Sequence, residues 1–140
     1  MDIFSAMEIN SSGMSAERKR MNLISSNIAN ARTTRTEDGG PYKRKDAVFQ
    51  SVLLPGLDKE DAESAPGVMV TEVLEDQAAP KLVYDPDHPD ADANGYVAFP
   101  NVVVVEEMVN MITATKAYEA NATSIKAVKD MAKKAINIAT

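Results

Sequence analysis

The chain has 140 residues, the length of one domain or of one compact unit with extensions. It contains no cysteine, which excludes disulfides, thiolate zinc sites and cysteine nucleophiles, and its single histidine, His88, excludes a metal site built on two histidines. A formal net charge of −6 argues against non-specific binding of nucleic acid. No apolar stretch approaches the ~20 residues that a membrane-spanning helix needs, so we expect no membrane insertion.

Prolines and glycines separate two helix-permissive ends from a turn-rich middle. All seven prolines lie between positions 41 and 100, and five of the six glycines lie in nearly the same stretch. Both residue types interrupt helices. Acidic charge gathers in the same region, because residues 51–100 carry 11 acidic and 2 basic side chains. We therefore predict an α+β protein, with a helical domain formed by residues 1–32 and 102–140 and a β-rich middle domain formed by residues 33–101.

The first predicted element is a long helix over residues 2–31. Steps that alternate between four and three residues from Ile3 meet an apolar side chain at six of eight positions, which is typical of a coiled-coil-like helical contact. Such a helix is longer than the average globular helix, and the chain offers little core for it to lie on. We therefore predict that this seam packs on the other terminal helix and on other chains. Its apolar members are Ile3, Met7, Met14, Met21, Ile24 and Ile28.

Two asparagines, Asn27 and Asn30, lie three residues apart at the end of this helix and therefore share a face. A buried Asn in a helical seam fixes the register of the contact at some cost in stability. Capping of the helix end by Asn30 is the alternative, and the sequence does not favour one over the other. We include both residues in the predicted seam.

The middle domain is expected to contain short strands and turns. Brief apolar runs alternate there with turn residues, the pattern of a small twisted β region. Residues 57–66 are acidic and are predicted to form an exposed loop. The expected strands are residues 47–49, 52–54, 68–70 with 73–74, 82–84 and 96–99.

One motif in the middle domain resembles a calcium site. The segment Asp90–Gly95 places oxygen ligands and a glycine as the first half of an EF-hand loop does. The position that needs a bidentate Glu holds Asn101, and Pro86 and Pro89 stand where the entering helix should be. We therefore predict a turn without a metal ion, and we expect its carboxylates to find cationic partners on a neighbouring copy.

No catalytic residue is predicted. His88 lies in a polar turn without a Ser or Thr nucleophile beside it. Glu106 and Glu107 open the second helix, where acidic side chains favour the positive end of the helix dipole. Phosphate-binding loops and dinucleotide-binding motifs are absent from the sequence, and we expect no cofactor.

The second predicted helix covers residues 102–138 and is rich in Ala and Lys, both good helix formers. The same four-and-three spacing starts at Met108 and defines a second thin seam. Its predicted contact residues are Met108, Met111, Ile112, Tyr118, Asn121, Ile125 and Ile136.

Basic side chains cluster on both helices and after the first. A solvated helix face is one explanation, and electrostatic pairing with the acidic middle domain of another copy is the other. The clustered residues are Arg18–Arg20, Lys43–Lys45, Lys126, Lys129, Lys133 and Lys134.

Four segments resemble motifs of the bacterial flagellar rod and hook proteins, in the same order along the chain. Val103 is one departure, since that family often has Asn there. The segments are Ser12–Ala16, Ser26–Lys45, Asp85–Asp92 and Glu106–Asn121.

The resemblance implies a structural subunit of the flagellar basal-body rod and not an enzyme. Members of that family leave the cytoplasm through the flagellar export apparatus without a cleavable signal peptide. They assemble helically in the periplasm with copies of themselves and other rod proteins, and they transmit motor torque. Two alternatives from other classes are a calcium- or peptidoglycan-acting module built on the Asp-rich loop, and a soluble helical adaptor or chaperone.

Overall fold

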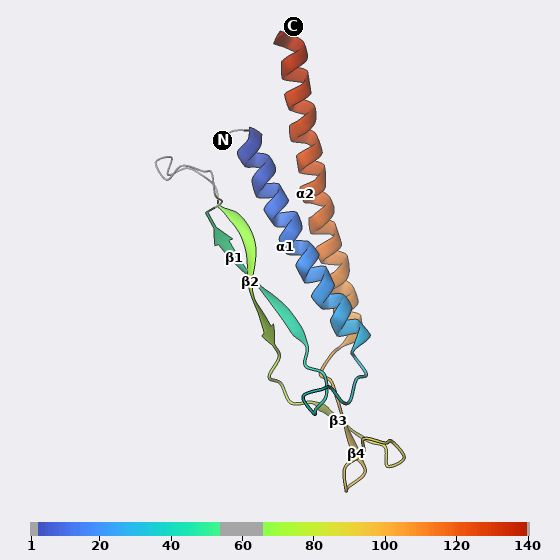
Figure 1. The fold of residues 1–140 in the computed structure, drawn as a ribbon. Helices are drawn as coiled ribbons and strands as arrows, with labels where there is room; N and C mark the ends of the chain where they lie inside the picture. The colour runs from blue at the N-terminus through green and yellow to red at the C-terminus, as the bar shows by residue number, and fades with distance from the viewer. Residues whose placement is uncertain (1–2, 54–65, 140) are drawn as a thin grey trace.

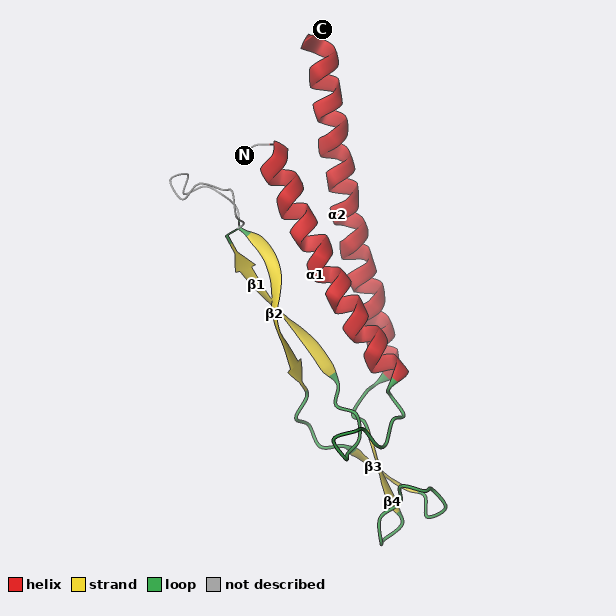
Figure 2. Cartoon of the chain, in the orientation of Figure 1, coloured by secondary structure: helices red, strands yellow, loops and turns green. Residues whose placement is uncertain are grey.

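The protein consists of two long helices with two narrow β ribbons between them in sequence (Figures 1 and 2). The computed structural model describes residues 3–53 and 66–139. This arrangement confirms the predicted α+β class. In chain order the elements are α1 (Ile3–Ala29), β1 (Lys45–Val52), β2 (Gly67–Glu75), β3 (Lys81–Tyr84), β4 (Tyr96–Phe99) and α2 (Val104–Ala139).

The strands are longer and fewer than the sequence predicts. The run expected at 47–49 and Val52 of the run expected at 52–54 belong to one strand, β1, which ends at Val52. Leu53 follows the strand, and Leu54 lies outside the described residues. The runs at 68–70 and 73–74 are likewise parts of β2, and the break between them is a bulge: Val70 pairs with Phe49 and Glu72 pairs with Val48, so Thr71 is the extra residue. Apart from Pro66, the predicted acidic loop lies outside the described residues.

The two helices pack against each other in opposite directions. The end of α1 meets the start of α2 where Asn27 bonds Glu107 at 2.9 Å, and nearer the other end Gly13 of α1 lies against Asn121 of α2. Since α1 begins only ten residues before Gly13 while α2 continues eighteen residues past Asn121, the last turns of α2 project beyond α1 (Figure 1).

The β1–β2 ribbon lies beside α1 and depends on it. A two-stranded sheet is marginally stable alone in water, and β2 is fastened to the helix where the Val68 N–H donates a hydrogen bond to Ser12 Oγ at 3.0 Å. The β3–β4 ribbon lies at the end of the molecule far from both termini (Figure 1).

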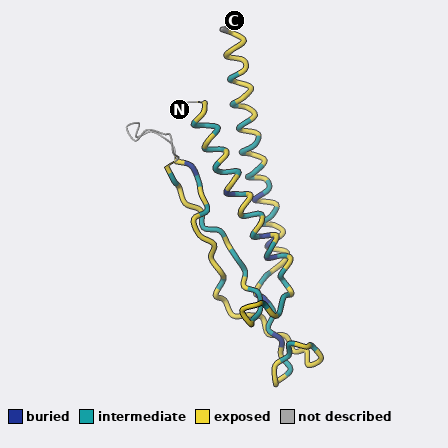
Figure 3. The backbone as a smooth tube through the Cα atoms, viewed as in Figure 1, coloured by how far each residue is buried: buried dark blue, intermediate teal, exposed yellow. Residues whose placement is uncertain are grey.

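The hydrophobic core of the described residues is thin. Its buried apolar members are small or few (Figure 3), and many large apolar side chains of both helices and both ribbons stay exposed. The buried apolar residues are Ala16, Ile24, Val97 and Ala114.

Among the described helices, neither combines the length and the apolar character needed to cross a membrane.

A larger residue at Gly13 should separate the helices. A Cβ atom there would lie 3.0 Å from Asn121 Nδ2 and 3.3 Å from its Cγ. We expect Gly13→Leu to lower the free energy of unfolding by about 1–3 kcal/mol, the usual cost of overpacking. Gly40→Leu is the matched control, since nothing lies within 4 Å of that position. Equal urea midpoints for the two variants would contradict the close helix contact.

Candidate functional site

Asn27 is the centre of a buried polar cluster that joins three segments of the chain. Its side chain is fully buried, and all four of its hydrogen-bonding positions are used. The Nδ2 group donates to the Lys45 carbonyl at 2.8 Å and to Glu107 Oε2 at 2.9 Å. The Oδ1 atom accepts from the Lys45 N–H at 2.9 Å and from the Tyr42 hydroxyl at 3.0 Å. We call Asn27, Tyr42, Arg44, Lys45 and Glu107 the Asn27 cluster.

Glu107 is the charged member of the Asn27 cluster and is 1% exposed. Arg44 Nε donates to its Oε1 atom at 2.8 Å, and Arg44 also bonds Asp46 at 3.1 Å. Burial alone would lower the pKa of the Arg44 guanidinium, but the hydrogen bonds that it donates to Glu107 and Asp46 raise it above its ordinary value. The guanidinium therefore stays charged, and the buried carboxylate has a cation and an amide beside it.

The two asparagines at the end of α1 have different roles. Asn27 fixes how α1, the segment after it and α2 meet. Asn30 lies past the last helical residue, where its Nδ2 group donates to the Ser26 carbonyl at 2.9 Å and its Oδ1 atom accepts from Thr33 Oγ1 at 3.2 Å. Asn30 thus caps the helix end, since its backbone N–H and its Nδ2 group both donate to the Ser26 carbonyl.

The predicted seam residues occupy two different surroundings. Those on α1 mostly turn toward the rest of the chain: Ile24 and Asn27 are buried, Met7, Met14, Met21, Ile28 and Asn30 are half-buried, and Ile3 is exposed. Those on α2 divide: Met111, Tyr118, Asn121 and Ile125 are half-buried, whereas Met108, Ile112 and Ile136 are exposed.

The division on α2 arises because its side toward α1 is occupied by residues that the apolar spacing does not include. Glu107 and Ala114 are both buried on this side of the helix: Glu107 lies one turn before Met111, and Ala114 lies about one turn after it. The sequence suggested a helix-start role or a contact to a neighbour for Glu107, but not its burial within the chain. Its position one turn before Met111 was a usable signal, but a charged residue is seldom buried without a partner, and Arg44 lies far away in sequence.

Four apolar side chains near the start of α2 form a continuous exposed strip. Val105 is 69% exposed, Met108 55%, Val109 58% and Ile112 61%. Their spacing places them on one side of the helix. We call these four residues the outer face of α2. Among the described residues, no segment covers it, and a strip of large apolar side chains is typical of a surface that binds a partner.

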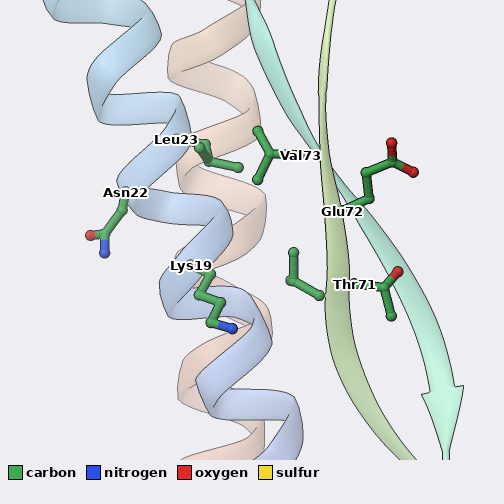
Figure 4. A pocket seen from close by; sticks show the side chains of 7 residues that line it. Lys19, Asn22, Leu23, Thr71, Glu72 and Val73 are labelled. Atoms are coloured by element: carbon green, nitrogen blue, oxygen red, sulfur yellow. The ribbon is translucent and has the colours of Figure 1, made fainter.

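A groove of about 380 Å³ runs between α1 and β2. Leu23 and Val73 approach each other across it, with Lys19 and Asn22 along α1 (Figure 4). Glu72, the only carboxylate that lines it, points away from α1 (Figure 4). The groove therefore lacks the paired acid and base, or nucleophile and base, that chemistry requires.

The Asp-rich segment forms a turn. Asp92 Oδ1 accepts hydrogen bonds from the Asn94 N–H at 2.8 Å and from the Tyr96 N–H at 2.9 Å, and Gly95 has φ +81°. Asp90 has partners within the chain, since its Oδ2 atom accepts from Thr34 Oγ1 at 2.8 Å and Arg35 lies 3.9 Å from its Oδ1 atom.

His88 belongs to the same turn. Its Nδ1 atom accepts a hydrogen bond from the Asp90 N–H at 3.1 Å, and its ring meets Phe99 edge-on with centroids 6.1 Å apart. One ring nitrogen is thus engaged in the turn. Within the part of the chain that the structure describes, no three side chains of the metal-binding types gather into a possible metal site.

Comparisons with known proteins place both helices in flagellar families. Residues 7–35 match the family described as "Flagella basal body rod protein", and residues 93–138 match the one described as "Flagellar basal body rod FlgEFG protein C-terminal". The chain is 43% identical over 151 residues to the flagellar basal-body rod protein FlgC of Borreliella burgdorferi, with 99% of this chain and 98% of the relative covered.

Two further relatives carry the same name. The chain is 43% identical over 138 residues to the protein of Salmonella typhimurium, with 99% of this chain and 98% of the relative covered. It is 38% identical over 148 residues to that of Bacillus subtilis, with 99% of both covered. These matches define a structural protein of the flagellar basal-body rod and confirm the resemblance seen in the sequence motifs. The chain belongs to the FlgC family of these rod proteins.

Removing the Asn27 side chain should weaken the whole fold. Asn27→Ala leaves the Lys45 backbone groups and the buried Glu107 without their amide partner, so we expect a loss of about 2–3 kcal/mol in the free energy of unfolding. Asn22→Ala, on the exposed side of the same helix, is the control and should change it by less than about 0.5 kcal/mol. Urea unfolding measures both. Similar values for the two variants would exclude a central role for the Asn27 cluster.

The Asp-rich turn should not respond to calcium. We expect the same melting temperature in millimolar calcium and in EDTA. Asp92→Ala should lower stability by about 1 kcal/mol through the loss of two accepted hydrogen bonds, whereas Asp92→Asn keeps an acceptor at the same place. A calcium-dependent rise in melting temperature that Asp90→Asn with Asp92→Asn abolishes would instead establish a metal site.

Proposed function

We propose that the chain assembles helically through its terminal helices, with copies of itself and with other rod proteins, and that the assembly transmits motor torque across the periplasm. The observation that carries this proposal is the thin core. In the described residues the large apolar side chains that stay exposed far outnumber those that are buried. A chain with this distribution gains most of its hydrophobic stabilisation from neighbours.

The length and polarity of the helix pair favour an open assembly. When one surface of a subunit binds a different surface of the next subunit, each end of the assembly keeps one unbound surface. Further subunits can then be added, and the assembly grows into a helix. The buried Asn27 cluster favours a fixed geometry of α1, α2 and the segment between them, which a load-bearing subunit requires. An adaptor or chaperone would not need this exposed apolar surface to be spread over both helices and both ribbons.

We infer a division of labour along the chain. Residues 1–32 and 102–140 form the assembling helical domain, and residues 33–101 form the outer β-rich domain. The predicted seam residues belong to the helical domain. We propose that they act there in contacts between the two helices or in contacts with neighbouring subunits. The chain needs neither a cofactor nor a catalytic residue for this role, and we propose that it is not an enzyme.

We also propose that the chain reaches the rod through the flagellar export apparatus. This proposal rests on the membership of the chain in the FlgC family.

A charge within the helix contact should block assembly and spare export. Met111 is half-buried one turn before Thr115, whose hydroxyl lies 3.6 Å from Met21 Sδ of α1. We expect Met111→Asp to abolish motility and incorporation into basal bodies, because an unpaired charge in a buried contact costs several kcal/mol. Secretion into the medium should persist, since export does not need that contact.

Met111→Leu is the control, since it conserves volume and apolar character and should support normal motility. Swimming in soft agar, immunoblots of purified basal bodies and immunoblots of the culture medium give the three measurements. Normal incorporation of the Met111→Asp variant would contradict assembly through the terminal helices.

A further inference from the structure

Like α2, helix α1 has an exposed face that no described segment covers. The side of α1 that turns away from the chain carries Phe4, which is 77% exposed, followed at alternating steps of four and three residues by Glu8, Ser11, Ser15 and Arg18, all exposed. Apart from Phe4 these side chains are small or charged. Two uncovered faces of different character thus exist on one chain, one with large apolar residues and one with small residues that allow a close approach.

Charged residues beside the two faces complement each other in an antiparallel register that also sets the outer face of α2 against this side of α1. In an antiparallel helix pair, each step forward along one helix matches a step back along the other. If Arg18 is set opposite Glu106, then Glu8 falls opposite Lys116. Among the described residues, Arg18, Glu8 and Glu106 form no ion pair, and Lys116 reaches only the exposed Glu119 at 2.9 Å.

The apolar side chains fit in the same register. Val109 falls opposite Ser15, and Ile112 lies close to Ser11. Further along, Phe4 falls opposite Ala120, which is exposed on α2. Val109, Ile112 and Phe4 therefore each meet a small residue, and the two ion pairs flank Val109 and Ile112. Charges at the rim of a contact specify its register more than its strength.

We propose that the outer face of α2 binds the exposed face of α1 of a second copy of this chain, antiparallel, with Arg18 paired to Glu106 and Glu8 paired to Lys116. Within one copy α1 and α2 run in opposite directions. If a second copy is related to the first by rotation about an axis parallel to the helices, then α1 of the second copy runs antiparallel to α2 of the first. The contact uses two different faces, so each copy keeps one free face of each kind for the next copy. The inference rests on the assembly proposed above and names the surfaces that carry it.

Cysteine cross-linking tests the register directly, because the chain has no cysteine of its own. Two single-cysteine chains, Ser15→Cys and Val109→Cys, are co-expressed in a strain that lacks the native gene. Any disulfide between them joins two copies, and it requires Cα atoms about 4.4–6.8 Å apart. We expect oxidation of purified basal bodies to give a heterodimer of these chains. Ser15→Cys with Ser124→Cys, which is exposed on α2 outside the proposed contact, should give none.

Reversal of the ion pairs supplies a second measurement. Glu106→Arg or Arg18→Glu alone should lower incorporation into basal bodies by about tenfold through like charges in register, and the two substitutions combined in one chain should restore it. If the cysteine chains enter basal bodies but the test and control pairs cross-link equally, the proposed contact is wrong, whereas the proposed rod assembly is not contradicted. Failure of the double reversal to restore incorporation would also count against it, whereas normal incorporation of Met111→Asp would contradict the assembly itself.

Discussion

The hydrogen bonds of Asn27 to Lys45 and Glu107 are the constraint on which the rest of the structure depends. They close the narrow end of the helix pair and bring the segment after α1 into contact with both helices. A buried amide whose four bonds are all used accepts only one arrangement of its partners. Because Arg44 reaches the same carboxylate, the start of β1, and through it the β1–β2 ribbon, has a fixed position relative to the helices.

This constraint replaces the usual role of a large apolar core. Four buried apolar residues cannot by themselves hold two long helices and two ribbons in place. Hydrogen bonds at separate points do so here: those of the Asn27 cluster at one end, and that of Ser12 to β2 further along. Between them the helices approach closely where Gly13 lies against Asn121. Apolar surface is thereby left for neighbours, and geometry is supplied by hydrogen bonds.

The sequence predicted the parts of the fold that depend on local patterns. Residue spacing indicated both helices to within a few residues, and turn residues marked the β region and the Asp92 turn. It did not predict that residues 47–49 and Val52 form one strand, because the polar Gln50 and Ser51 separate them, and it did not predict the bulge at Thr71 in β2. Nor did it place Glu107, since the partner that permits its burial, Arg44, comes 63 positions earlier in the chain. The sequence indicated that Asn27 could be buried in the helical contact, but it did not indicate the residues to which Asn27 is hydrogen-bonded.

The unequal lengths of the two helices have a consequence for order at the end of the subunit. Past the level at which α1 begins, α2 continues for about two turns, to Ala139. Short helical stretches gain much of their stability from what packs on them, and helix ends fray. A neighbouring molecule that packs on this end of α2 would therefore make it more ordered.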